Sequence, residues 1–208
     1  MKPIIFCTDM VKALLNTKPG VWPVEPIDVS KPYKSHTRRV IKPIPEYDFL
    51  YPEPIDGEWF WTECDTDDDM MGWWPSYENG LSAPYRVGDI LYVRETWCKH
   101  EYGFDYKVLE NGNVWGNEYS EKWKPSIHMA REASRIFLEV KSVRVERLQD
   151  ITCEDAKNEG VKRDCGCEVV GYCTAFYKVW NALNAKRGYS WESNPWVWVY
   201  EFIRVEKS

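Results

Sequence analysis

The sequence predicts an α+β protein with a small β-barrel, and two observations lead to this prediction. Short segments rich in β-branched and aromatic residues outnumber the segments with helical periodicity. Strands in such excess would leave exposed edges, and closing a sheet into a barrel removes them. The chain has 208 residues, enough for one domain with its own core, so we expect a single domain over residues 1–208.

The N-terminal part contains one expected helix between two expected strands. Residues 2–7 are apolar enough for a strand, and Thr8 is a favourable N-cap for a helix over residues 8–15. Four prolines between residues 16 and 33 predict a loop, and residues 36–41 resume as a strand. The helix has one apolar stripe, formed by Met10, Val11, Leu14 and Leu15.

Residues 43–85 differ from the rest of the chain in composition. They contain eleven Asp and Glu residues and no Lys or Arg, and their tryptophans are Trp59, Trp61, Trp73 and Trp74. So many aromatic residues argue against a disordered linker, and we expect an ordered insertion on the domain surface. The formal net charge of the chain is −6, so removing the −11 of this segment leaves +5 elsewhere. The acidic balance therefore does not exclude a nucleic-acid ligand.

The second half of the chain alternates strands with amphipathic helices. Apolar, β-branched and aromatic residues recur at alternate positions in three expected strands, residues 90–98, 133–148 and 196–205. Thr152 and Asp155 have the spacing of a capping box and open a helix that Gly160 ends. A second helix has an apolar face made by Ala175, Phe176, Val179, Trp180 and Leu183.

Composition also indicates the cellular compartment of the protein and the state of its cysteines. No stretch approaches the roughly 20 apolar residues that span a membrane, so we expect a cytoplasmic protein without a membrane partner. Seven cysteines, an odd number, are more consistent with reduced thiols than with a disulfide framework. Thiolate zinc sites usually pair cysteines as C-x2-C, so we expect no metal and no other cofactor. Zinc binding stays open for Cys153, Cys165, Cys167 and Cys173.

A lysine and a threonine in the basic tract have a spacing that could carry chemistry. In Lys34-Ser-His-Thr37, the threonine hydroxyl becomes a nucleophile only if a base removes its proton. Lys34 is such a base only if burial or neighbouring cations lower its pKa. Positions i and i+3 of a strand face opposite sides, so the two side chains meet only if the chain bends at Ser35-His36. Most lysines and threonines at this spacing are solvated surface residues.

Two arginines and a distant glutamate are further candidates. Neighbouring strand residues point to opposite sides, so we expect at most one of Arg38 and Arg39 to share a pocket with Thr37. The other would lie outside the pocket or pair with the acidic insertion. Glu159 ends its expected helix, where the negative end of the helix dipole raises the pKa of a carboxyl group. A raised pKa suits a proton carrier, although an exposed glutamate without a role is the commoner case.

Glu95, Trp97 and Trp196 are candidates for contact with a ligand. Glu95 and Trp97 share one face of their expected strand, and a buried Glu95 needs a cation, for which Arg94 and Arg38 are available. Trp196 lies on an aromatic strand face that could stack on a base, although core packing is the commoner use of such residues.

Several segments in one order resemble the ASCH-domain proteins that are common in bacteriophages and prophages. They include MKPIIFCTDMVKALL, KSHTRRVIKP, YRVGDILYVRETW and EDAKNEGV, and the resemblance covers roughly residues 1–15, 34–43, 84–98, 123–161 and 176–206. ASCH domains belong to the PUA-like superfamily of small β-barrels associated with RNA binding and modification. The resemblance implies a PUA-like barrel with flanking helices and a large surface insertion at residues 43–85.

Within that superfamily, the chain is distantly similar to the bacterial acetylcytidine amidohydrolases. These use a K-x-x-T element after the first helix and a glutamate in a helix that follows the long barrel strand. Lys34 and Thr37 match the first element, and the stretch from Asp155 to Glu159 is similar to the second. The resemblance implies Thr37 as nucleophile, Lys34 as its base and Glu159 as the acid or base for the leaving amine. About eighteen additional residues precede Lys34, so Lys18 is a rival for the catalytic lysine.

Three functions follow as hypotheses. The first is amide hydrolysis on an acylated nucleoside or nucleobase such as acetylcytidine. The second is a module that binds RNA or a modified base through Arg38, Arg39 and aromatic faces without turnover, with ribonuclease activity as a further option. The third is an interaction protein whose acidic insertion, residues 43–85, occupies a host protein partner.

Overall fold

The computed structural model describes residues 1–28, 31–42, 50–55, 58–63, 80–111, 113, 123–164 and 170–206. In this part of the chain, helices and strands combine into an α+β fold, as the sequence predicts. The expectations for Cys165, Cys167 and the side chains of Trp61, Trp73 and Trp74 fall outside the described residues, as do those for the acidic side chains of residues 43–80.

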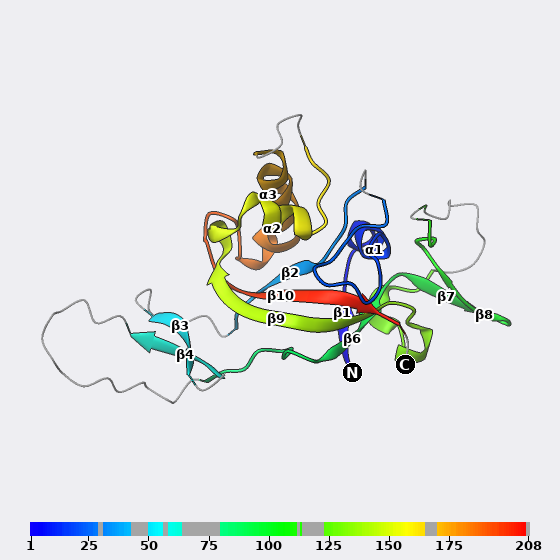
Figure 1. The fold of residues 1–208 in the computed structure, drawn as a ribbon, viewed down its shortest axis with the longest axis horizontal. Coiled ribbons are helices and arrows are strands. Elements are labelled where there is room, and N and C mark those ends of the chain that lie inside the picture. Colours follow the sequence, from blue (N-terminus) through cyan, green and yellow to red (C-terminus); the bar gives the residue numbers. More distant parts are fainter. Residues whose placement is uncertain are drawn as a thin grey trace, which may run out of the picture.

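Five strands form the main sheet of the fold: β1 (Lys2–Ile5), β2 (His36–Val40), β6 (Ile90–Arg94), β9 (Phe137–Arg147) and β10 (Trp196–Val205). Their order across the sheet is β1-β6-β9-β10-β2 (Figure 1). β1 runs parallel to β6, and the other neighbouring pairs are antiparallel. β9 and β10 are the longest strands of the sheet and form its curved centre.

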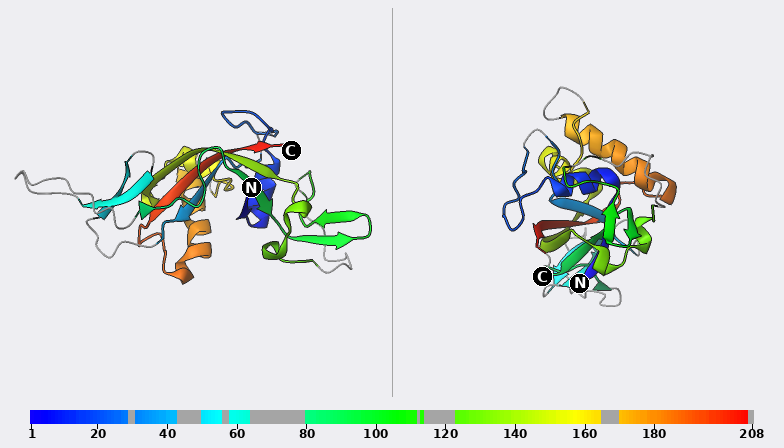
Figure 2. Two further views of the ribbon diagram at one scale, coloured as in Figure 1. Left: turned by 90° about the horizontal axis from the view of Figure 1, so that it is seen from below. Right: turned by 90° about the vertical axis from the view of Figure 1, so that its right-hand side faces the viewer.

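Two smaller sheets extend from opposite ends of the main sheet (Figures 1 and 2). Within residues 43–85, the first sheet has the order β3 (Leu50–Ile55), β4 (Glu58–Glu63) and β5 (Gly80–Leu81). Trp59 of β4 packs edge-on against Trp198 of β10, with 5.8 Å between the ring centroids. The second sheet is a hairpin of β7 (Trp97–His100) and β8 (Gly103–Tyr106).

Three α-helices lie on the same side of the main sheet (Figure 1): α1 (Thr8–Leu15), α2 (Cys153–Asn158) and α3 (Val170–Asn184). The stripe predicted for α1 is buried, and each buried leucine or valine contributes about 1.5–3 kcal/mol to folding. The predicted capping box is present, because Thr152 Oγ1 accepts from the Asp155 backbone and the Asp155 side chain accepts from the Thr152 backbone. No described helix combines the length and apolar character needed to cross a bilayer.

The main sheet is open along one seam. β1 and β2 are its two edge strands, and no backbone pairing joins them in the part of the chain that the structure describes. Instead, the side chain of Arg39 in β2 reaches toward β1, where its Nη2 donates to the Ile5 carbonyl oxygen at 2.9 Å. The α+β class is therefore confirmed. At the seam, where a closed barrel would have backbone hydrogen bonds between two strands, this sheet has the side-chain hydrogen bond from Arg39 to Ile5.

The expectation of one strand over residues 90–98 is wrong. β6 ends at Arg94, Glu95 and Thr96 lie outside any strand, and β7 begins at Trp97. At this break the side chain of Glu95 is buried and binds Arg135. Alternation of apolar and polar residues does not reveal this turn, because it continues through the break. The helix N-cap also differs by one residue, since Cys7 occupies the cap and Thr8 is the first helical residue.

Candidate functional site

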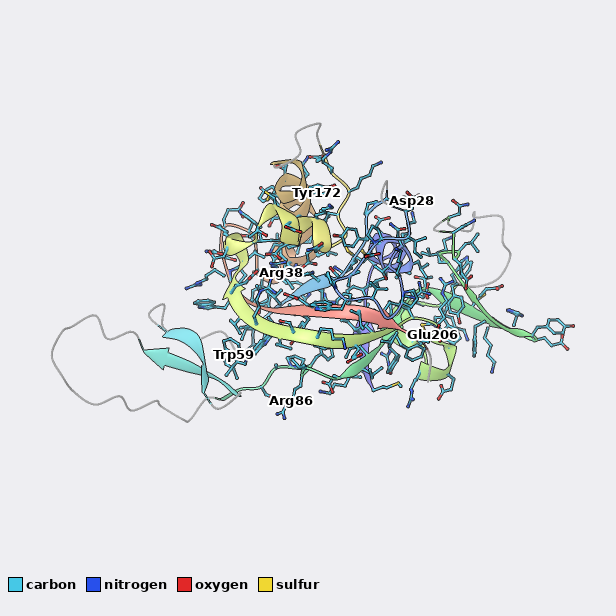
Figure 3. All side chains as sticks on the ribbon, in the orientation of Figure 1. Asp28, Arg38, Trp59, Arg86, Tyr172 and Glu206 are labelled. Atoms are coloured by element: carbon cyan, nitrogen blue, oxygen red, sulfur yellow. The ribbon has the colours of Figure 1, made fainter. Side chains whose placement is uncertain are left out.

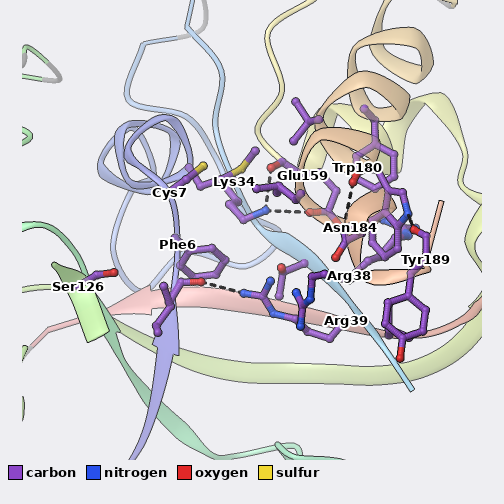
Figure 4. A pocket seen from close by; sticks show the side chains of 18 of the residues that line it. Phe6, Cys7, Lys34, Arg38, Arg39, Ser126, Glu159, Trp180, Asn184 and Tyr189 are labelled. Atoms are coloured by element: carbon purple, nitrogen blue, oxygen red, sulfur yellow. Dashed lines mark hydrogen bonds and ion pairs between the residues drawn. The ribbon is translucent and has the colours of Figure 1, made fainter. Parts of the chain in front are cut away.

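A cavity of about 500 Å³ opens beside the seam between β1 and β2. Phe6 lines it from the segment between β1 and α1, Thr37 and Arg39 from β2, and Trp180 from α3. Lys34 and Glu159 lie side by side in this cavity (Figure 4). A pocket of this size suits a small organic ligand.

Lys34 and Glu159 form a buried ion pair. The Lys34 Nζ lies 2.8 Å from Glu159 Oε2 and also donates to the Glu159 carbonyl oxygen at 2.7 Å. The two residues are only 2% and 4% exposed. A buried ammonium is costly unless it has such partners, so this pair is a built feature of the fold and not a surface contact.

The backbone brings the two residues together. Lys34 and Glu159 form an antiparallel bridge, and the next amide, Ser35 N, donates to the Asn158 carbonyl oxygen at 2.8 Å. The chain then turns at Gly160, whose φ of +84° is unfavourable for other residues. A Cβ on Gly160 would lie 2.8 Å from the Ala13 Cβ and 3.0 Å from the Lys34 Cβ. Glycine is therefore required here for conformation and for space.

Arg38 holds the other side of the Glu159 carboxylate. Its Nη1 donates to Glu159 Oε1 at 3.1 Å, its Nε donates to Glu146 Oε1 at 2.9 Å, and Nη2 lies 3.3 Å from Asp155 Oδ2. Its side chain has no solvent exposure and lies between the helices and the main sheet (Figure 3). Three carboxylates thus occupy this guanidinium, so Arg38 positions Glu159.

These contacts decide the pKa directions in the site. Burial lowers the pKa of Lys34, and the neighbouring Glu159 carboxylate opposes this shift without cancelling it. Burial alone would raise the pKa of Glu159, but the charges and hydrogen bonds of Lys34 and Arg38 outweigh it and lower that pKa. The expectation of a raised pKa for Glu159 is therefore wrong, because two adjacent cations exceed the effect of a short helix. Glu159 is also the C-cap of α2 and not its last helical residue.

Thr37 is buried and lines the same cavity as Lys34 and Glu159. Lys34 precedes β2 and bridges to Glu159, whereas Thr37 lies inside β2 opposite Tyr200 of β10. Pairing with β10 extends to Ser35, whose carbonyl oxygen accepts from the Phe202 amide at 2.9 Å, and the structure describes no bend at Ser35-His36. The Lys34 ammonium hydrogen-bonds to Glu159 and not to the Thr37 hydroxyl.

Both Arg38 and Arg39 line the cavity, so the expectation that at most one would do so is wrong. β2 is an edge strand, and four consecutive residues, 37–40, border the cavity. A pocket beside the open edge of a strand is reached from both of its faces, so the alternation rule does not apply. Arg39 lies over the Phe6 ring, with 5.4 Å from its Cζ to the ring centroid.

The other three candidates do not line this cavity. Glu95 receives 2.9 Å hydrogen bonds from Nε and Nη2 of Arg135. Its cation is therefore Arg135 and neither of the expected partners, Arg94 and Arg38. Trp97 packs in a separate cluster with Met129 and Ala133.

Trp196 pairs with Arg147 of β9, whose guanidinium carbon lies 4.3 Å from the ring centroid. Lys18, the rival lysine, is exposed and paired with Glu25 at 2.6 Å. Neither residue lines the cavity with Thr37.

Several cavity residues were not predicted as site residues. Phe176 and Trp180 are on the apolar face of α3, where their helical spacing indicates core packing. Phe6 and Tyr189 also line the cavity from outside regular strands. No signal in a single sequence distinguishes an aromatic residue that lines a pocket from one that fills a core.

The cavity thus combines a hydroxyl, an amine with a lowered pKa, a carboxylate and aromatic walls. Within the described residues, no group of three His, Cys, Asp or Glu could hold a metal ion. Comparisons with protein-family models, with curated proteins and with solved structures found no match. The chemistry of the site is therefore the basis for the function below.

Proposed function

We propose that the protein is an amidohydrolase that removes an acyl group from the amine of a nucleobase, as in acetylcytidine. The observation that carries the proposal is the shared cavity of Lys34, Thr37 and Glu159, with 2.8 Å between the Lys34 Nζ and Glu159 Oε2. A hydroxyl, a buried amine and a carboxylate in one pocket can supply the nucleophile, the base and the proton carrier of amide hydrolysis without a metal. The resemblance to the acetylcytidine amidohydrolases assigns the same three residues.

The proposed reaction has two halves. Thr37 Oγ1 attacks the amide carbonyl carbon and forms a C–O bond, while neutral Lys34 takes the hydroxyl proton. The C–N bond then breaks as the amine leaves with that proton, passed on by Lys34 directly or by way of Glu159, and the acyl group remains on Thr37 as an ester. Water attacks that ester, giving the carboxylic acid and the free hydroxyl. The lowered pKa of Lys34 supports its role, because the amine must be neutral to accept a proton.

We propose further that the main sheet is a PUA-like barrel of the ASCH type, open between β1 and β2. The Arg39 to Ile5 hydrogen bond across the seam supports this interpretation, because it links the two edges that a closed barrel would pair. In this interpretation, the cavity is the mouth of the barrel.

Matched variants test the hydrolase assignment. We expect Thr37→Ala and Glu159→Gln to abolish release of acetate from acetylcytidine, while Thr37→Ser, which keeps a hydroxyl, retains measurable turnover. Thr17→Ala removes a buried hydroxyl outside the cavity, and Glu95→Gln alters a buried glutamate outside it, so both controls keep turnover per folded molecule. Thermal unfolding and circular dichroism of each variant measure the folded fraction. Turnover by folded Thr37→Ala at the wild-type rate would reject the assignment.

A second candidate function is binding of a nucleobase or RNA without turnover. The observation that favours it is the resting geometry, in which Lys34 is bonded to Glu159 and not to Thr37. Phe6, Phe176 and Trp180 supply aromatic surfaces on which a base could stack. Binding of cytidine with equal affinity by wild type and Thr37→Ala, together with no acetate release by either, would favour this function over hydrolysis.

A further inference from the structure

Three cations that line the cavity have no carboxylate partner among the described residues. Arg39, Lys42 and Arg187 all border it, and none of them forms an ion pair within the described part of the chain. Lys42 and Arg187 are exposed, whereas Arg39 is half-buried. Burial lowers the pKa of the Arg39 guanidinium, the Glu159 carboxylate opposes this shift, and the charge of Arg187 adds to it. The three cations therefore raise the positive electrostatic potential in this cavity.

This arrangement contrasts with the adjacent Arg38. Arg38 contacts three carboxylates, and Lys34 is paired with Glu159. Cations that share a concave site without such partners favour an anionic ligand, because the concave surface concentrates their field.

Lys42 borders a part of the cavity that is separate from the Lys34–Glu159 pair, whereas Arg39 lies over the same Phe6 ring as the Lys34 ammonium, at 5.4 Å and 5.3 Å from the ring centroid. The Lys42 Nζ lies 5.2 Å from the centroid of the Tyr189 ring, and in Figure 4 Tyr189 is on the far side of Arg38 from Lys34. Thr37 and Val40 are three positions apart in β2, roughly 10 Å along the strand, and Lys42 follows two residues later outside the strand. Thr37 and the cations line one cavity, so a ligand with its reacting group at Thr37 can place a second group near the cations.

Arg39 also has free donor capacity. Its Nη2 makes one hydrogen bond, to the Ile5 carbonyl oxygen, although a guanidinium has five N–H groups. A guanidinium binds a phosphate through two parallel hydrogen bonds, which gives both strength and orientation. Arg39 could thus keep its contact with Ile5 while it binds an oxyanion.

We infer that Arg39, Lys42 and Arg187 form a phosphate subsite, so that the substrate is a nucleoside monophosphate and not a free nucleoside. The inference rests on the proposed function for the position of the base, which lies among the aromatic walls near Thr37. The phosphate then lies at the cations of the same cavity, and its charge is neutralised there.

Calorimetric titration with cytidine 5′-monophosphate and with cytidine, neither of which is hydrolysed, tests the subsite. We expect the monophosphate to bind wild type about tenfold or more tightly than cytidine. Lys42→Ala/Arg187→Ala should remove that preference and leave cytidine affinity unchanged. Lys162→Ala/Arg163→Ala is the control, because it removes one exposed Lys and one exposed Arg that do not line this cavity, and it should keep the preference.

Several outcomes would overturn the inference. They are equal affinity of wild type for the two ligands, absence of monophosphate binding at millimolar concentration, and an equal loss for both ligands in the double variant. A short cytidine oligonucleotide provides a further comparison. If it binds much more tightly than the monophosphate and depends on the same two cations, the ligand is a nucleic-acid strand and the monophosphate assignment fails.

The same data separate this inference from the proposed function. A preference for the monophosphate without acetate release from any acetylated substrate rejects hydrolysis and keeps the subsite. Acetate release from acetylcytidine and from its 5′-monophosphate at the same kcat/KM, without a binding preference, rejects the subsite and keeps hydrolysis.

Discussion

Glu159 binds the ammonium of Lys34 twice, once through its side-chain Oε2 at 2.8 Å and once through its own carbonyl oxygen at 2.7 Å. One residue thus fixes both the position and the charge environment of the amine. Burial removes water from the same amine and lowers its pKa. The balance between these two effects sets the pH at which Lys34 can accept a proton.

We expect kcat/KM for deacetylation to rise with pH through a pKa below 10.5, the ordinary value for lysine. The sign follows because protonated Lys34 cannot take the Thr37 proton, so activity appears as the ammonium loses its proton. Lys34→Arg keeps the charge but cannot deprotonate, and we expect it to lower kcat by about 10²–10⁴-fold. A pH–rate profile over the neutral and alkaline range checks both points. A profile without a rising limb, or an active Lys34→Arg variant, would show that Lys34 is not the base.

Glu159 should make the protein more sensitive to acid. Its pKa in the folded state is below its ordinary value of 4.5, so its stabilising effect is complete above that value and is lost as pH falls through the folded-state pKa. We expect Glu159→Gln to lower the free energy of unfolding at neutral pH, with a smaller difference from wild type in acid. Urea unfolding at neutral and acidic pH measures this difference. A constant difference across that range would contradict the pKa direction.

Gly160→Ala should damage both stability and the site. The left-handed φ costs about 1–2 kcal/mol for alanine, and the contacts with Ala13 and Lys34 add about 1–3 kcal/mol of overpacking. Gly188→Ala is a matched control, because Gly188 has φ +86° but no atom within 4 Å of the added Cβ. We expect Gly160→Ala to be the less stable variant in urea unfolding and to lose turnover. Equal stability of the two variants would mean that the close packing at Gly160 has no energetic weight.

Arg135→Met should destabilise the protein without changing turnover per folded molecule. It leaves the buried Glu95 carboxylate without its cation, which costs about 3–5 kcal/mol, and neither residue lines the cavity. Lys178→Met breaks an exposed pair with Asp164 and should cost less than about 1 kcal/mol. Chemical denaturation and activity measurements check both variants. A reduced kcat/KM in folded Arg135→Met would connect Glu95 to the substrate site.

Cys173 should react slowly with alkylating reagents at neutral pH. Burial and the adjacent Cys153 thiol, 2.7 Å away from sulfur to sulfur, raise the pKa of Cys173 to about 11. The thiolate is the reactive form, so alkylation should accelerate as pH approaches that value. Peptide mapping by mass spectrometry after timed iodoacetamide treatment, with exposed Cys7 as the reference, measures the rate. Equal rates for Cys173 and Cys7 at neutral pH would contradict the raised pKa.

Local patterns predicted much of the fold because they reflect local physics. The apolar stripe of α1, the capping box at Thr152 and the alternation in residues 196–205 each depend on neighbours in the sequence. The break after β6 was missed because the alternation continues through it, and the partner of the buried Glu95 there, Arg135, lies forty positions away. The open seam was missed for a related reason, since edge pairing between β1 and β2 depends on the whole sheet.

Part of the residue set of the candidate cavity could be predicted from the sequence, but its electrostatics could not. Lys34, Thr37 and Glu159 were singled out by spacing and by resemblance, and the structure brings them to one cavity. The pKa direction of Glu159 was wrong because Arg38 and Lys34 both reach its carboxylate, and no pattern in the chain shows that pairing. Arg39 and Arg38 share the cavity because it borders a strand edge, a property of the sheet order and not of either residue.

The backbone bridge between Lys34 and Glu159 joins positions that are 125 residues apart in the sequence. Three strands of the main sheet, β2, β6 and β9, lie between them in the chain. The bridge can therefore close only when these strands have assembled, so the amine and the carboxylate meet only in the folded sheet.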